Sequence, residues 1–294
     1  KMSVPSGPYA PLKIPDFRLF ISARFCVTLA IQIQAVVVAW QVYEMTKDPL
    51  SLGLIGLAEA IPSIGVSLYA GHVADSVQRK KIILVCLSTL LICSVALLSF
   101  TIDLGAFILQ YDVVPIYTVI FISGIARGFL TPAVFSYMPQ LVPRELYPNA
   151  VTWNSTLWET ASIGGPALAG FLYGFLGITA SYLTDALLMA CGLFLIIGVS
   201  NKDLPETTHE QGVVEKIRSG LRFVFRNPLI LSAISLDLFA VLFGGAVALL
   251  PIFANEILMV GAEGLGVLRS APAVGALLMA VYITHNPIMK NTGK

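Results

Sequence analysis

Four ionisable side chains lie deep inside long apolar stretches of this sequence, where a charge is uncommon. They are Arg24, Arg127, Glu159 and Asp237. An ionised side chain at the centre of a membrane helix costs roughly 2.5–3.5 kcal/mol on insertion scales. Residues kept there despite this cost bind substrates, carry protons or pair with one another. The chemistry that these residues indicate is therefore proton or substrate binding inside a membrane.

Arg127 and Glu159 fall at similar depth in two consecutive apolar segments. Antiparallel neighbours would bring them together, either as a structural ion pair or as a protonatable, substrate-binding pair in a cavity. Asp237 has no cation at like depth in its own part of the chain, so it suits a proton carrier, with a polar role in helix packing as the alternative. Arg24 either lines the cavity or extends its guanidinium to the membrane surface. Asp185 is expected near the membrane interface.

An internal repeat indicates a second set of charged candidates. A shift of 210 residues aligns two copies of the same Gly and Pro pattern, namely Gly56, Pro62 and Gly65 with Gly266, Pro272 and Gly275. The same shift aligns Glu59 with Arg269, which carry opposite charges. We hypothesise that this pair helps to close an outer gate, with chance alignment as the alternative.

The remaining reactive residue types do not form an enzyme site. The histidines occur in loops or at segment ends (His72, His209 and His285), and the four cysteines have no CxxC spacing (Cys26, Cys86, Cys93 and Cys191). Buried cysteine usually behaves as a small hydrophobe. We therefore expect no metal, no cofactor and no enzyme activity. The tryptophans (Trp40, Trp153 and Trp158) are assigned to packing or to the interface rather than to a cavity.

The composition is that of an integral membrane protein. Of 294 residues, 56% are hydrophobic and 12% are charged, and the mean hydropathy is +0.83. An ordinary soluble domain carries roughly a quarter charged residues. The charges are nearly balanced, with Lys+Arg 18 and Asp+Glu 17, so no basic field favours nucleic acid. The expected partners are membrane lipid and a small-molecule substrate.

Eight apolar segments are long enough to cross a bilayer as helices, since a core of ~30 Å needs ~20 residues. They cover about residues 17–45, 50–73, 81–102, 113–140, 149–175, 180–199, 228–256 and 263–283. Prolines inside them are tolerated because neighbouring membrane helices re-satisfy the freed backbone groups. The predicted fold is an all-α integral membrane bundle of about eight transmembrane helices.

Loop charges orient this bundle. When the eight segments cross the membrane in alternation, all but four of the 18 Lys and Arg residues fall on the side of the membrane that holds the N-terminus. The positive-inside rule then places the N-terminus in the cytoplasm. We expect a multi-pass protein of the plasma membrane, which in a bacterium is the inner membrane.

The segment 210–226 differs in kind from the apolar segments. Val213, Ile217 and Leu221 share one face, and basic residues cover the rest, which is typical of an amphipathic helix on a membrane surface. Together with the repeat, it predicts an N-terminal six-helix half (1–199), a cytoplasmic linker (200–226) and the start of a second half (227–294). Four helices of that second half are then missing, so the chain is expected to be truncated.

Three motifs carry a resemblance to a known family. After the second segment, Gly71 is followed by Asp75 and Arg79, which resembles the signature loop of the major facilitator superfamily, although Ser76 and Gln78 depart from it. The fifth segment holds a Gly-Pro motif similar to that of proton-coupled exporters, formed by Gly165, Pro166 and Gly170. The run from residue 124 to 143 resembles the fourth helix of the drug, macrolide and siderophore exporter branch.

This resemblance implies a transporter of two six-helix halves with alternating access around a central cavity. It implies that Asp75 and Arg79 latch the cytoplasmic ends of the halves, with a simple turn and membrane anchor as the alternative. The implied gating residues are Gly71, Asp75, Arg79, Glu59 and Arg269. Gly165, Pro166 and Gly170 would let the fifth helix bend, or would only allow close packing.

The expected function is secondary active transport, most concretely the efflux of a hydrophobic or amphiphilic, drug- or siderophore-like molecule by a proton antiporter. The coupling ion is supplied by the proton gradient, no other cofactor is expected, and the protein is expected to act as a monomer. The alternative is a non-transporting membrane fragment or a receptor-like protein.

Overall fold

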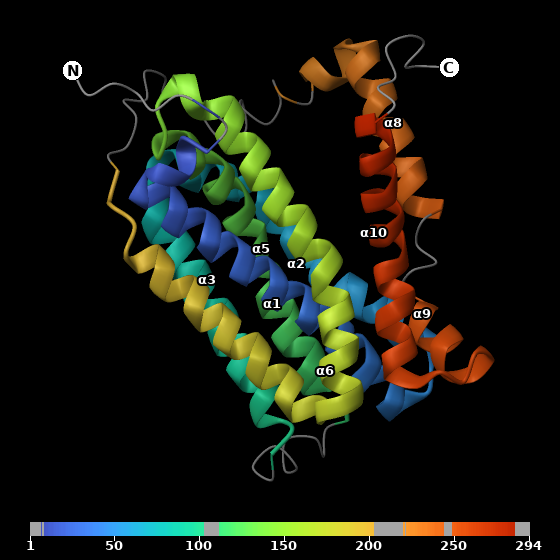
Figure 1. Ribbon diagram of the computed structural model, residues 1–294. Helices are drawn as coiled ribbons and strands as arrows, with labels where there is room; N and C mark the ends of the chain where they lie inside the picture. The colour runs from blue at the N-terminus through green and yellow to red at the C-terminus, as the bar shows by residue number, and fades with distance from the viewer. Residues whose placement is uncertain are drawn as a thin grey trace.

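The computed structural model describes residues 7, 9–102, 112–202, 220, 222–243 and 249–285, and within these ranges it contains helices and no strand. Figure 1 shows long helices arranged in two groups. The main helices are α1 (Pro15–Thr46), α2 (Pro49–Ser76), α3 (Arg79–Ser99), α5 (Val114–Tyr137), α6 (Tyr147–Ile197), α8 (Pro228–Phe243) and α10 (Gly261–His285). Shorter elements are η1 (Pro11–Lys13), η3 (Met138–Gln140), η4 (Arg144–Leu146), α9 (Leu250–Ile252) and the π-helix η6 (Phe253–Ile257).

Local sequence signals set several helix ends. Asp48 is the N-cap of α2, and its carboxylate accepts a hydrogen bond from the backbone N–H of Leu50 at 3.0 Å, followed by Pro49 at the first helical position. At the end of α6, the ammonium of Lys80 donates hydrogen bonds to the carbonyls of Ile197 and Val199. A cation is favourable there because the last carbonyls of a helix have no intrahelical partner.

The 51-residue helix α6 is two spans joined at one residue. A straight helix of this length would be about 75 Å long, more than twice the bilayer core. Gly177 has φ 82 and ψ 177, a conformation that only glycine adopts readily, and the chain reverses there (Figure 1). The two spans correspond to the predicted segments 149–175 and 180–199.

The other predicted segments also coincide with helices, and one of them is interrupted. The predicted segment 228–256 consists of α8, then α9 and η6, with residues 244–248 outside the described part. Most of the predicted amphipathic segment 210–226 also lies outside the described residues. Five described helices are long and apolar enough to cross a membrane. The predicted total of eight spans and the predicted domain boundaries stay predictions.

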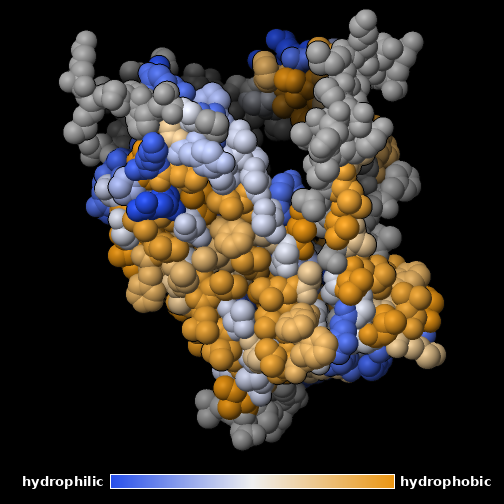
Figure 2. Space-filling model, viewed as in Figure 1, coloured by the Kyte–Doolittle hydropathy of each residue, from blue (hydrophilic) through white to orange (hydrophobic). Residues whose placement is uncertain are grey.

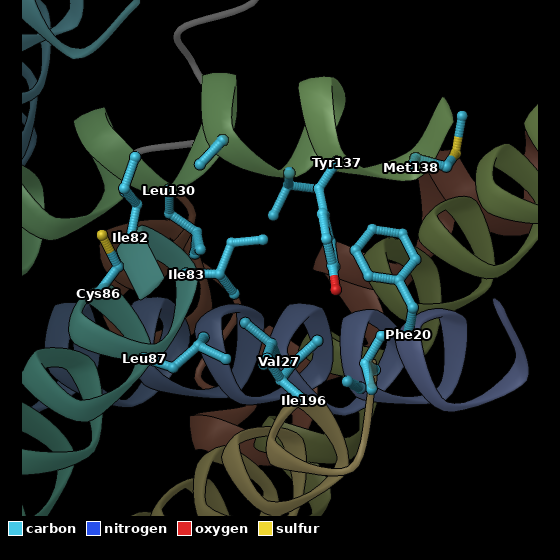
Figure 3. Packing of buried hydrophobic residues seen from close by; sticks show 14 of the residues in the cluster. Phe20, Val27, Ile82, Ile83, Cys86, Leu87, Leu130, Tyr137, Met138 and Ile196 are labelled. Atoms are coloured by element: carbon cyan, nitrogen blue, oxygen red, sulfur yellow. The ribbon is translucent and has the colours of Figure 1, made fainter. Parts of the chain in front are cut away.

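The first group of helices, α1, α2, α3, α5 and α6, packs into one bundle around an apolar core. Figure 3 shows part of this core, in which Phe20 and Val27 of α1 face Ile83 and Leu87 of α3 and Leu130 of α5. Phe20 is fully buried. This packing fixes the inner faces of the helices, which also carry the polar side chains of interest.

Among the described residues, the second group, α8 to α10, meets the first at one end. The two groups touch at the lower end of Figure 1 and diverge toward the upper end, and the space-filling view in Figure 2 shows the same separation. Apolar residues also cover much of the outer surface in Figure 2. Exposed examples are Val85, Ile92, Phe175 and Phe194. A surface this apolar is stable in lipid and unstable in water.

Candidate functional site

A cavity of about 430 Å³ lies between α1, α3, α5 and α6. Its polar lining comes from Arg24, Thr28, Gln32, Thr131 and Ser162. Its aromatic lining comes from Phe20, Phe135 and Trp158. A mostly apolar wall with a few polar groups at fixed positions is the usual composition of a small-molecule site.

Arg24 is the cation of this cavity. Its guanidinium carbon lies 5.7 Å from the centre of the Phe135 ring, within cation–π range. Arg24 lines the cavity in the structure. A guanidinium held over an aromatic face presents its remaining N–H groups to an anionic ligand.

Sequence reasoning missed most of the other lining residues and misplaced one. Trp158 was assigned to packing or to the interface, and this prediction was wrong because Trp158 lines the cavity. A signal was available, since Arg24, Thr28 and Gln32 recur every fourth residue and therefore form one polar stripe on α1.

Arg127 forms the second feature of the site, a polar cluster that joins three helices. Its guanidinium is paired with the carboxylate of Glu59 in α2 and donates a hydrogen bond to Oε1 of Gln34 in α1 at 2.8 Å. The predicted pairing of Arg127 with Glu159 was therefore wrong. The physical reason is helix adjacency, because α5 packs along α2 so closely that a Cβ at Gly124 would lie 2.5 Å from the carbonyl oxygen of Glu59.

The two remaining intramembrane acids stand apart from this cluster. Glu159 in α6 and Asp237 in α8 are both exposed, and no residue in the described ranges forms an ion pair with either. The structure thus brings Arg24 into a cavity and Arg127 into a cluster, and it brings neither Glu159 nor Asp237 to them.

The two groups of helices meet through small residues and a hydrogen bond. Gly266 of α10 lies against Gly170 of α6, where an added Cβ would come within 2.8 Å of the Gly170 Cα. Nearby, the hydroxyl of Tyr43 in α1 donates a hydrogen bond to the carboxylate of Glu256 in η6. The hypothesised contact of Glu59 with Arg269 is not formed here, because Glu59 is paired with Arg127.

The remaining motif residues occupy helix ends and packing contacts. Gly71 lies in the penultimate turn of α2, and the side chain of Asp75 is outside the described part of the structure. Arg79 begins α3 and lines a second cavity of about 590 Å³ together with Arg144 and Lys202. In α6, Pro166 is buried, and a Cβ at Gly165 would lie 2.5 Å from the Cβ of Gln32.

No group of three metal-ligating side chains occurs among the described residues. Apolar helices of spanning length define a multi-pass membrane protein, and a cavity lies between them. The chain belongs to the transmembrane secretion effector family of the major facilitator superfamily, whose family model matches residues 6–287.

Individual relatives agree with this assignment. The chain is 20% identical over 274 residues to the staphyloferrin A transporter of Staphylococcus aureus, covering 90% of this chain and 66% of that protein. It is 24% identical over 268 residues to the enterobactin exporter EntS of Shigella dysenteriae, covering 91% of this chain and 62% of that protein. The chain thus spans less than two thirds of the length of these relatives.

A solved structure shares the fold. The POT family transporter PepTSo superposes with a TM-score of 0.58 at 16% identity, covering 92% of this chain and 53% of that chain. At this identity the likeness shows a common helical architecture and nothing about the substrate.

Proposed function

We propose that this protein exports an amphiphilic, siderophore-like small molecule in exchange for protons by alternating access. The observation that carries the proposal is the contact between the two helix groups at one end and their separation at the other (Figure 1). Two groups of helices that meet at only one end correspond to one of the two states that alternating access requires.

The excess of basic residues in the loops on the side of the N-terminus supports a cytoplasmic N-terminus in a bacterial inner membrane. In that orientation the closed end lies on the outer side, and the arrangement is inward-facing. The protein acts as a monomer surrounded by lipid, and the proton gradient is the energy source without a further cofactor.

The chemistry of the cavity supports the substrate class. Arg24 supplies one fixed cation, and Phe135 and Trp158 supply aromatic faces, so an anionic molecule with an apolar or aromatic body fits best. The names of two relatives, a staphyloferrin A transporter and an enterobactin exporter, favour a siderophore.

The test is transport by the purified protein in proteoliposomes, with iron-free enterobactin and iron-free staphyloferrin A as separate probes. We expect one of them to move faster when a proton gradient is imposed, and the movement to slow when a protonophore collapses the gradient. Equal movement in protein-free liposomes, for both probes, would contradict the proposal.

A further inference from the structure

Asp185 is a buried acid that the site described above does not use. It lies in the second span of α6, eight residues beyond the Gly177 turn and thus about 12 Å along the helix. Its exposed fraction is 0%, and neither carboxyl oxygen has a hydrogen-bond partner among the described residues. The structure encloses Asp185 between α6, α1 and α3. The prediction that it lies near the membrane interface concerns depth and stays a prediction.

The groups that face Asp185 come from several helices. The nearby groups are Ser94 and Cys93 of α3, Gln34 of α1 and the cation Arg127 of α5. On α6 itself Tyr182 is the nearby titratable group, and its hydroxyl already donates a hydrogen bond to Gln41 at 2.5 Å. Glu59 of α2 reaches this region through its ion pair with Arg127.

This environment fits a neutral acid better than a carboxylate. An ionised carboxylate without a hydrogen-bond donor is costly in an apolar interior, whereas a protonated one carries no charge and offers an O–H donor. The hydroxyl oxygen of Ser94 is also buried and without a partner in the described residues, so it can accept that hydrogen bond. One proton would therefore satisfy two buried groups together.

The guanidinium of Arg127 is only partly satisfied by its partners. Its terminal nitrogens bind Glu59 and Gln34, while its Nε has no partner among the described groups. When the O–H bond of Asp185 breaks and the proton passes to water, the negative charge left on Asp185 attracts the guanidinium. The pull toward Asp185 competes with the pull of Glu59.

We propose that Asp185 is the proton-binding site of this protein and that its proton controls whether Arg127 binds Glu59. The proposal deepens the proton exchange put forward above and rests on it for its role in transport. With the proton bound, Arg127 holds α2 through Glu59, as in this structure. With the proton released, Arg127 turns toward Asp185 and the contact between α2 and α5 weakens.

The close contact between α2 and α5 would transmit the release of Arg127 from Glu59 to the rest of α2. Gly124 and Gly128 lie on either side of Arg127 along α5 and pack against the backbone of Glu59 and Ser63. A displacement of Arg127 therefore acts on this close packing between α5 and the backbone of α2. Because α2 leads directly into Arg79 at the start of α3, proton occupancy at Asp185 would reach the loop that the family motif assigns to gating.

Infrared spectroscopy of the purified chain in lipid tests the proton site without any substrate. At neutral pH we expect a carbonyl stretching band of a protonated carboxylic acid that is absent in Asp185→Asn. The band should shift in Ser94→Ala, which removes the acceptor. Glu145→Gln, a change at an exposed acid, should leave the band unchanged. Identical carboxylic-acid bands in the wild type and Asp185→Asn would overturn the proposal. If Asp185→Asn does not fold, an unshifted band in Ser94→Ala would overturn it.

Transport separates this proposal from the proposed function. Asp185→Asn should still let enterobactin or staphyloferrin A run down its own gradient while losing acceleration by a proton gradient. Acceleration equal to that of the wild type would refute a role for Asp185 in coupling. If the wild type moves neither probe, the proposed function fails, and the infrared band still decides whether Asp185 holds a proton.

Discussion

The hydroxyl of Tyr43 in α1 hydrogen-bonds to the carboxylate of Glu256 in η6, although 213 positions separate these residues in the chain. The bond joins the first helix group to the second at the end where they touch. Beside it, Gly170 and Gly266 bring the backbones of α6 and α10 together. A polar bond and a small-residue contact thus act at the same closed end.

Removing the Tyr43 hydroxyl should favour opening of this end. A hydrogen bond to a charged group contributes about 1.5–3 kcal/mol, so Tyr43→Phe should raise the open population roughly 10- to 100-fold. Spin labels can be placed on cysteines substituted for Leu176 and Met259, which are both exposed near this end. Opening of this end would appear as a longer distance between the two labels. Tyr117→Phe is the matched control, because that hydroxyl bonds the Ser51 carbonyl within the first group. Equal distances in Tyr43→Phe and the wild type would argue against a gating role.

A methyl group at Gly266 should also hold the closed end apart. The added Cβ would approach the Gly170 Cα to 2.8 Å, and such overpacking costs about 1–3 kcal/mol. We expect Gly266→Ala to slow transport and lengthen the same label distance. Gly275→Ala on the same helix places its Cβ in open space and should change neither quantity. A normal distance in Gly266→Ala would show that the helices accommodate the methyl group.

The ion pair of Glu59 with Arg127 should stabilise the first helix group. Glu59→Gln leaves the guanidinium with a weaker partner, and we expect the free energy of unfolding to fall by about 1–3 kcal/mol. Exchanging the charges by combining Glu59→Arg with Arg127→Glu should recover part of this loss. Thermal unfolding in detergent measures both effects. Glu159→Gln, at an exposed acid, should change stability by less than about 0.5 kcal/mol. An unchanged unfolding temperature in Glu59→Gln would mean that the pair contributes nothing.

Arg24 should control the affinity for an anionic substrate. Arg24→Gln removes the charge, and we expect the apparent KM for the transported probe to rise about tenfold, which corresponds to about 1.4 kcal/mol. Arg24→Lys keeps the charge but loses the planar contact with Phe135. Its apparent KM should therefore lie between those of the wild type and Arg24→Gln. Arg18→Gln, at an exposed position six residues earlier in α1, is the control. An unchanged KM in Arg24→Gln would remove Arg24 from the substrate site.

The apolar segments could be predicted because a bilayer imposes a minimum length of apolar helix. The break between residues 175 and 180 was found for the same reason, since one helix cannot continue through two bilayer thicknesses. Depth in the membrane could not predict the partner of Arg127, because depth does not say which helix lies beside it. Gly124 and Gly128 carried that information, as two glycines four residues apart mark a close helix contact.

Burial of Asp185 was harder to predict. Its short distance from the turn indicated an interfacial position, yet burial depends on how many helices surround a residue at that depth. Gln34 and Ser94 are uncharged and gave no signal in the sequence, so their proximity to Asp185 emerges only from the packing of α1 and α3 against α6.

The single-residue reversal at Gly177 also bears on how the protein reaches the membrane. No loop separates the two spans of α6. We therefore expect them to enter the bilayer together as a helical hairpin, which carries Asp185 in with the second span. The conformation of one glycine would in this way set the order of membrane insertion during synthesis.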